Sequence, residues 1–214
     1  MDTSIRTRVP RPPLRQALGI FLAAAVLAAA ALPTGGSFLG AEEAGAPTAE
    51  SLATGPALTG GLQQAAGRDG MTLWVSPETG EFEVRLPDGT AWSSNPADRA
   101  DDKKARDIWK TNLQSQFIVE YVNLEGRIRD TVNSFVGSVR KDGLTVLPVE
   151  NGFLSVYEFT KEKFMVPLQV TLEAGFLRVR ARMDLARGDG EAYYFGGLQL
   201  LPFFGAGTES ETGY

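Results

Sequence analysis

Most of the chain after residue 70 alternates between apolar and polar residues with a period of two, and this pattern constrains its fold class. The runs 71–75 and 82–86 both show the alternation. The segment 76–80 between them holds Pro and Gly, which supply the fixed φ and the positive φ of a tight turn. Alternating runs joined by such turns predict antiparallel strands. With a third short strand at 90–92, they predict a meander.

The same reasoning predicts a longer antiparallel series in the second half of the chain. Apolar side chains with a helical spacing predict two short helices, at 98–110 and 128–139. Along 176–183, Leu177, Val179, Ala181 and Met183 are expected to face inward, and three arginines are expected to face outward. The predicted strands are 117–122, 144–149, 153–159, 166–172, 176–183, 192–195 and 198–204. The sequence therefore predicts a mainly β protein, an antiparallel β-sandwich with one or two short helices.

The segment 196–205 is the most apolar uncharged stretch beyond residue 40. We expect it to be a buried strand around which the sandwich is organised. The chain stops ten residues after Phe204, before another element could form. Because an apolar terminal strand without a further partner exposes an edge, we expect the sandwich domain, 70–214, to be incomplete at its C-terminus.

The N-terminal segment 1–32 resembles an export signal. Arg6, Arg8, Arg11 and Arg15 precede the uncharged run 17–32, which ends in alanines that satisfy an A-x-A cleavage rule. The run is shorter than the ~20 apolar residues that span a bilayer comfortably. The segment is expected to be a cleaved signal peptide or, alternatively, an uncleaved anchor. Either way, the rest of the chain is expected to be extracellular or at the cell surface, in contact with a membrane only through this segment.

The segment 33–69 is rich in Ala, Gly, Thr and Pro and shows no sustained hydrophobic period. Such a composition buries too little apolar surface to offset the entropy of ordering. We expect a flexible linker.

Composition excludes several functional classes. The chain of 214 residues contains no Cys and no His, which rules out a thiolate nucleophile, a Ser-His-Asp triad and the usual zinc ligand sets. We expect no metal site and no cofactor. The formal net charge of −5 leaves no basic footprint for nucleic acid. Catalysis would have to use carboxylate, Lys, Tyr or Ser chemistry, including the paired carboxylates of glycosidases.

Five aromatic residues could stack on sugar rings, although core packing is the favoured interpretation for each. They are Trp74, Trp92, Trp109, Tyr193 and Tyr194.

Charged residues offer further candidates, each with a plainer alternative. Glu81, Glu83 and Glu120 could form an acid/base set, but the outer faces of strands suit them better. Asp184, Asp189 and Glu191 have oxygen ligands for calcium, but their spacing matches no ligand loop. The sequence Arg187-Gly188-Asp189 forms an integrin-type tripeptide in what reads as a solvated turn. The ladder Arg178, Arg180 and Arg182 could contact an anionic glycan or could simply line an exposed strand face. No residue is assigned as catalytic, and no carbohydrate contact can be assigned.

Five segments together resemble the N-terminal part of large exported bacterial proteins of unknown function. In that family a β-sandwich similar to the galactose-mutarotase-like supersandwiches precedes a glycosidase-like (β/α) barrel. The segments, which occur in the same order with similar spacing, are Leu73–Phe82, Trp92–Pro96, Ser115–Tyr121, Asn133–Phe135 and Leu200–Ala206.

The resemblance implies a glycoside-hydrolase-like parent whose barrel follows the equivalent of Tyr214, so no catalytic residue is carried over to this chain. Our leading hypothesis is a non-catalytic sandwich module of an exported carbohydrate-active protein, which binds glycan or supports a missing barrel. The alternative is a stand-alone structural or adhesion module of the cell envelope.

Overall fold

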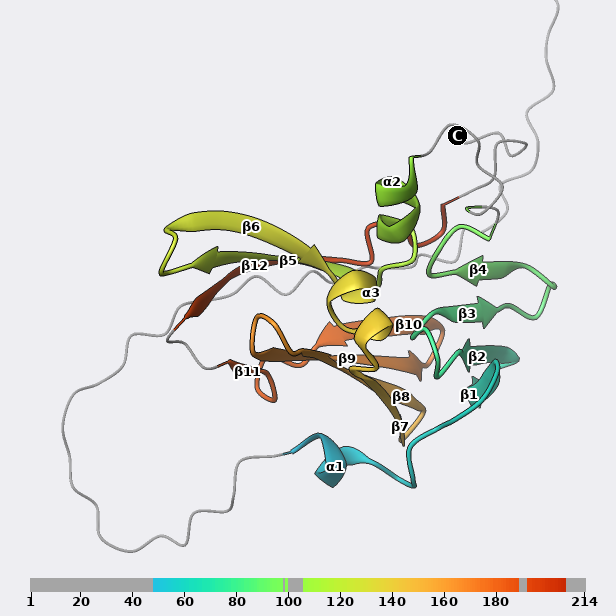
Figure 1. Cartoon of the computed structure of the whole chain (residues 1–214). Coiled ribbons are helices and arrows are strands. Elements are labelled where there is room, and N and C mark those ends of the chain that lie inside the picture. The colour runs from blue at the N-terminus through green and yellow to red at the C-terminus, as the bar shows by residue number, and fades with distance from the viewer. Residues whose placement is uncertain (1–47, 98, 100–105, 189–191, 207–214) are drawn as a thin grey trace, which may run out of the picture.

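The computed structural model describes residues 48–97, 99, 106–188 and 192–206. These residues form a mainly β protein built from antiparallel sheets, which confirms the predicted fold class (Figure 1). Three short α-helices accompany the strands in this part of the chain, one more than the upper number expected. The export segment 1–32 lies outside the described residues. Among the described residues, no helix has the length and apolarity needed to cross a membrane.

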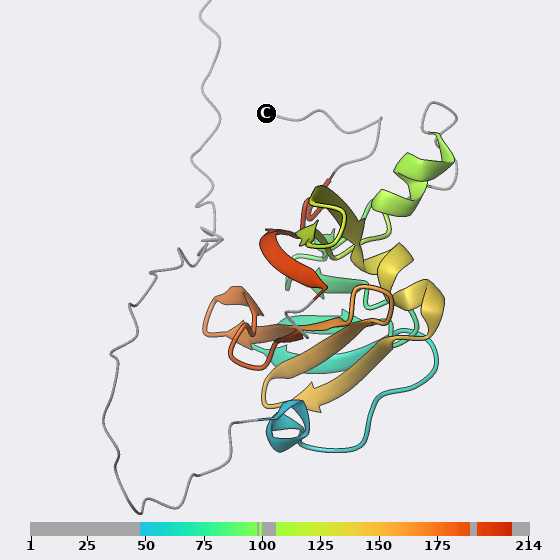
Figure 2. The same cartoon turned by 60° about the vertical axis from the view of Figure 1, so that its left-hand side comes forward.

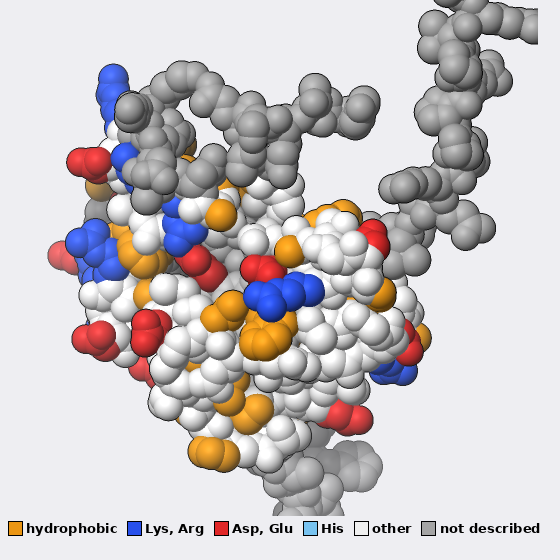
Figure 3. Space-filling view, turned by 90° about the vertical axis from the view of Figure 1, so that its right-hand side faces the viewer, with side chains coloured by type: hydrophobic (Ala, Val, Ile, Leu, Met, Phe, Trp, Pro, Cys, Tyr) orange, Lys and Arg blue, Asp and Glu red, His pale blue; other side chains and the backbone are white. Residues whose placement is uncertain are grey.

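The first sheet is a meander of four strands in chain order. It contains β1 (Gln63–Arg68), β2 (Met71–Val75), β3 (Phe82–Arg85) and β4 (Ala91–Ser93). The last three strands confirm the predicted meander. Hydrophobic side chains on the face shown in Figure 3, which looks onto this side of the molecule, lie in separate small groups among polar surface.

The second sheet, here called the central sheet, has the order β10-β9-β8-β7, and a two-residue strand, β11 (Arg187–Gly188), pairs with β9. Its main strands confirm the antiparallel series expected from the sequence: β7 (Leu144–Val149), β8 (Gly152–Phe159), β9 (Phe164–Glu173) and β10 (Phe176–Ala181).

The third sheet has the order β12-β5-β6 and contains β5 (Phe117–Asn123), β6 (Ile128–Asn133) and β12 (Tyr193–Leu200). Its middle strand, β5, confirms the strand expected at 117–122.

Aromatic contacts show how the sheets pack. The ring of Phe82 from the first sheet lies 5.8 Å from that of Phe153 in the central sheet. Phe117 from the third sheet meets Tyr157 of the central sheet edge to face, with ring centroids 4.9 Å apart. Phe153 and Tyr157 are both fully buried and lie at i and i+4 on β8, so they project to the same face. The first and third sheets therefore cover one face of the central sheet, and the main core lies between them.

A second, smaller core covers the opposite face of the central sheet, here called the outer face. Ala49 of α1 (Ala49–Leu52) packs there with Leu147, Leu154 and Leu185. Figures 1 and 2 show α1 against the β7–β8 part of the sheet, on the side away from β5. This second layer explains why β8 is buried along almost its whole length.

The prediction of a flexible linker over 33–69 is wrong for its described part. Residues 48–69 contain α1 and β1, and β1 pairs with β2. The oxygen Oγ1 of Thr48 accepts a hydrogen bond from the amide of Ser51 and caps α1. The hydrophobic pattern of this segment is weak, but tertiary contacts order it. The backbone of β2 needs hydrogen-bond partners, which β1 provides, and α1 covers apolar side chains on the outer face of the central sheet.

The predicted helix at 128–139 is wrong over its first half, which forms β6. The β-branched residues Ile128, Thr131 and Val132 pair with β5. Helical structure begins only with α3 (Ser134–Gly137), where Asn133 Oδ1 accepts a hydrogen bond from the amide of Val136 at 2.7 Å, and continues in a 3-10 turn, η1 (Val139–Lys141).

The helix expected at 98–110 is observed only as α2 (Asp107–Asn112), and residues 98 and 100–105 lie outside the described part. Two of the apolar side chains whose helical spacing predicted this helix, Ile108 and Trp109, are 69% and 60% exposed, so they do not pack into a core.

The expectation of a buried organising strand at 196–205 is also wrong. The two strands predicted at 192–195 and 198–204 form one strand, β12, with a bulge between Phe195 and Gly197. It lies at the edge of its sheet and is only half buried, whereas β8 and β9 are the most buried strands. Met183, expected to face inward, lies beyond the end of β10 and is exposed.

Polar residues from three of the resemblance segments form a buried hydrogen-bonded cluster. The amide nitrogen Nδ2 of Asn95 donates to the carbonyl of Ser115 at 3.0 Å, and Nε2 of Gln116 donates to Oδ1 of Asn95 at 2.5 Å. The backbone amide of Gln116 donates to Oγ of Ser134 at 2.8 Å. These bonds tie the end of β4 to the starts of β5 and α3, which is a structural role.

Candidate functional site

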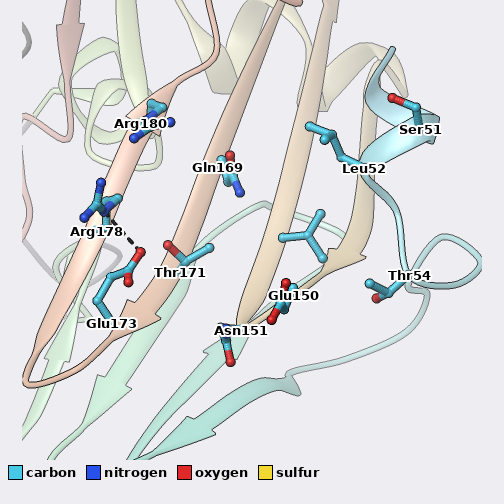
Figure 4. Close-up of a pocket in the computed structure, with 11 residues that line it drawn as sticks. Ser51, Leu52, Thr54, Glu150, Asn151, Gln169, Thr171, Glu173, Arg178 and Arg180 are labelled. Carbon is cyan, nitrogen blue, oxygen red and sulfur yellow. Dashed lines mark ion pairs between the residues drawn. The ribbon is translucent and has the colours of Figure 1, made fainter. Parts of the chain in front are cut away.

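A cavity of about 480 Å³ opens on the outer face of the central sheet (Figure 4). Its base and one side come from β9 and β10, its other side from α1 and the chain just after it, and one end from the β7–β8 turn. The lining residues are Ser51, Leu52, Thr54, Val149, Glu150, Asn151, Gln169, Thr171, Glu173, Arg178 and Arg180.

The register of β9 and β10 places the polar groups of this cavity side by side. Arg180 lies opposite Gln169, and Arg178 lies opposite Thr171. Residues directly opposite each other in an antiparallel pair project to the same face. The prediction that Arg178 and Arg180 face outward is therefore confirmed, and both side chains are exposed at the cavity.

One of these two arginines is already neutralised. Nε of Arg178 lies 3.2 Å from Oε1 of Glu173, across the β9–β10 turn. Among the described residues, no side chain or backbone group forms a hydrogen bond or a close ion pair with the guanidinium of Arg180. Arg180 therefore carries the positive charge of the cavity that no close ion pair neutralises, although Asp184 is near enough for its pKa to be lowered by Arg182 and, more weakly, by Arg180.

The third arginine of the ladder, Arg182, orients a cavity side chain without lining the cavity itself. Its guanidinium donates to Asp184 through Nε, at 2.9 Å, and through Nη2, at 2.6 Å. These bonds raise the pKa of Arg182 and lower the pKa of Asp184. Nη1 of Arg182 donates to Oε1 of Gln169 at 2.9 Å, which leaves the amide NH₂ of Gln169 as the group available to a ligand.

Thr171 adds a hydroxyl to the base of the cavity. The residue is only 8% exposed, and within the described part of the chain its hydroxyl makes no hydrogen bond. The hydroxyl lines the cavity, so it can donate a hydrogen bond to a ligand there or accept one from it.

The opposite wall is fixed by its own hydrogen bonds. The amide of Thr54 donates to the carbonyl of Pro148 at 2.8 Å, and its hydroxyl donates to the same oxygen at 3.2 Å. Oγ of Ser51 donates to the carbonyl of Thr48 at 2.8 Å. Both hydroxyls keep lone pairs, so they can accept hydrogen bonds from a ligand.

None of the five candidate aromatic residues lines the cavity. Three pack against neighbours: Trp74 lies under the guanidinium of Arg85, 4.6 Å from the ring centre, Trp92 packs against Phe204, and Tyr193 packs against Tyr121. Trp109 and Tyr194 are exposed, on α2 and β12, so core packing, the favoured interpretation, is wrong for these two residues.

The carboxylates considered for acid/base chemistry have separate surroundings. Oε1 of Glu81 lies 2.6 Å from Nη2 of Arg99, and partial burial raises the pKa of Glu81 despite this ion pair. Glu83 forms a 2.6 Å ion pair with Arg85, while Glu120 is exposed on a different sheet. None of the three lines the cavity.

The other charged candidates do not assemble into a site. Asp184 is bound by Arg182, and Asp189 and Glu191 lie outside the described residues, so the Arg-Gly-Asp tripeptide is described only through Arg187 and Gly188 of β11. Among the residues that the structure describes, no group of three or more acidic side chains is placed to hold a metal ion.

Sequence reasoning identified the arginine ladder but missed Gln169 and Thr171. These two polar residues lie at i and i+2 in an otherwise apolar strand, so they must share a face. That spacing was the available signal that β9 carries a polar surface patch.

No protein-family model, curated protein or solved structure matches the chain.

Proposed function

We propose that the chain is a non-catalytic β-sandwich module of an exported carbohydrate-active protein and that it binds a glycan in the outer-face cavity. The observation that carries this proposal is the set of polar groups that line the cavity. They are held by β9 and β10 on one side and by α1 and the chain just after it on the other. Sugar hydroxyls act as both donors and acceptors. The cavity offers guanidinium and amide donors from Arg180 and Gln169, hydroxyls from Thr171 and Thr54, and a carboxylate from Glu150. A few well-placed polar groups in a concave site are typical of small-ligand recognition.

The non-catalytic part of the proposal rests on the carboxylates of the cavity. Glycosidases of the common type use two carboxyl groups on opposite sides of the scissile bond, one of which donates a proton. The cavity contains Glu150 and Glu173, but Glu173 is engaged by Arg178. This arrangement suits binding better than hydrolysis.

The test is a screen of the full chain against immobilised oligosaccharides, followed by titration calorimetry with each glycan that binds. Thr171→Val removes the hydroxyl that lines the cavity but keeps the shape of the side chain. We expect it to weaken binding by about 3- to 10-fold, the value of one lost hydrogen bond. Thr131→Val, an exposed change on β6, is the matched control and should leave the affinity unchanged.

Two results would overturn the proposal. Absence of saturable binding to any glycan would reject the glycan site and favour the alternative, a structural or adhesion module. Hydrolysis of aryl glycosides by the pure protein would reject the non-catalytic assignment.

A further inference from the structure

We infer that the glycan bound in the outer-face cavity carries a single carboxylate group, as a uronic acid does, and that Arg180 and Gln169 recognise it. This inference rests on the proposed function and adds the chemical class of the ligand. It follows from two observations on β9 and β10. The free hydrogen-bonding groups of Gln169 and Arg180 are donors, and the positive charge of Arg180 is not neutralised by a close ion pair.

The β9–β10 side of the cavity holds two adjacent donor side chains, Arg180 and Gln169, beside the Thr171 hydroxyl and the ion-paired carboxylate of Glu173. Arg180 has only donors, and among the described residues none of them is used. Gln169, directly opposite on β9, has its oxygen engaged by Arg182, so its free group is the NH₂ donor. Two adjacent side chains that both donate need a ligand group that only accepts. A carboxylate meets this requirement, because its two oxygens can take parallel bonds from a guanidinium and a further bond from the amide.

The charges around the cavity limit the ligand to one acidic group. Two arginines and two glutamates line it, and Glu173 neutralises Arg178. Figure 4 shows Glu150 at the β7–β8 turn, away from Arg180 on β10. A second acidic group placed near Glu150 or Glu173 would be repelled, so a densely charged polyanion is a poor fit. The remaining cavity suits the neutral hydroxyls of the same or the next sugar.

The test compares matched ligands by titration calorimetry with the full chain. The probes are oligosaccharides of glucuronic and galacturonic acid, their carboxyl-reduced counterparts, which carry a neutral CH₂OH group at the same position, and sulfated analogues. We expect at least one uronic-acid oligosaccharide to bind about 10-fold or more tightly than its reduced counterpart, as charge-assisted hydrogen bonds predict. Added salt should reduce the difference.

Substitution of Arg180 connects the preference to this site. Arg180→Gln should weaken binding of the acidic sugar about 10-fold and so remove its preference over the neutral counterpart, because the charge that pairs with the carboxylate is lost. Arg140→Gln, an exposed change on η1, is the control and should keep the preference. The melting temperature of each variant checks that the fold is retained.

The outcomes separate this inference from the proposed function. Equal binding of acidic and reduced oligosaccharides, a stronger response to sulfated sugars, or a preference that survives Arg180→Gln would overturn the carboxylate assignment while leaving a glycan site in place. Absence of binding to every probe and every screened glycan would reject the proposed function and this inference together.

Discussion

Nη1 of Arg182 donates a hydrogen bond to Oε1 of Gln169 at 2.9 Å, while the same guanidinium binds Asp184 through Nε and Nη2. Arg182 does not line the outer-face cavity, yet it determines which end of the Gln169 amide is free to meet a ligand. In the proposed site, the orientation of Gln169 is therefore set by a residue just outside the cavity.

Replacement of Arg182 by Ala should weaken binding of the acidic oligosaccharide about 5-fold, because the Gln169 amide is no longer held in one orientation. Arg182→Lys should restore part of the affinity, since an ammonium can still donate to Gln169. Calorimetry measures both. The control is Arg85→Ala, which removes another arginine–carboxylate pair, with Glu83, away from the cavity. If Arg182→Ala bound like the unchanged protein, Arg182 would have no positioning role.

The main core predicts a large loss of stability for Phe153→Ala. The side chain is fully buried on β8 and meets Phe82 of the first sheet. Removal of a buried phenyl ring typically lowers the free energy of unfolding by about 3–5 kcal/mol. Urea unfolding followed by circular dichroism measures the change, and Tyr194→Ala, at a residue 62% exposed, should change it by only about 0.5 kcal/mol. A loss below about 1 kcal/mol for Phe153→Ala would contradict this packing.

Tyr157→Phe should leave stability unchanged or raise it by up to about 1 kcal/mol. The hydroxyl of Tyr157 is buried without a hydrogen-bond partner of normal geometry, so its removal relieves a desolvation penalty; the neighbouring Ser155 hydroxyl, itself unpaired, only partly offsets the effect of burial on the Tyr157 pKa. The ring remains in contact with Phe117. A clear loss of stability in urea unfolding would show that the hydroxyl has a partner in solution.

Gly80→Ala should be destabilising, and Tyr157→Phe should recover part of the loss. Gly80 has a φ of +73°, and a Cβ there would collide with the hydroxyl of Tyr157. Removal of that hydroxyl gives some room, although the strain of the positive φ remains. A double-mutant cycle from urea unfolding measures the coupling, and strict additivity of the two changes would contradict the contact.

Alkaline pH should destabilise the fold partly through Tyr121. Burial, followed by the nearby Asp130 and Glu162, raises the pKa of Tyr121 from 10.0 to about 12. Between these two values the unfolded chain loses the phenolic proton while the folded chain keeps it. Stability is therefore fully present below pH 10 and is lost as the pH rises toward 12.

Tyr121→Phe should show a smaller fall in the free energy of unfolding over that range, as measured by urea unfolding at several pH values. Burial also raises the pKa of Tyr157, so part of the alkaline loss should remain in the variant. Identical pH profiles for the two proteins would contradict the shift at Tyr121.

The sequence by itself determined the strands that are buried on at least one face. The runs 71–75, 144–149 and 153–159 were recognisable because alternation or continuous apolar character is what a strand against a core requires. The outward direction of Arg178 and Arg180 followed from the same period of two. These are local properties, so the order of residues along the chain is enough to find them.

Tertiary structure alone decided the elements with weak patterns. The strands β1 and β6 form because β2 and β5 offer backbone groups that need partners, and α1 is held by a small core on the outer face. The apolar stretch at 196–205 became an edge strand and a turn, since hydrophobicity along the chain does not specify which neighbours a strand obtains. The cavity depends on the same level of structure. Arg180 and Gln169 face each other only through the register of β9 with β10, and α1 reaches the opposite wall from more than a hundred residues earlier in the chain.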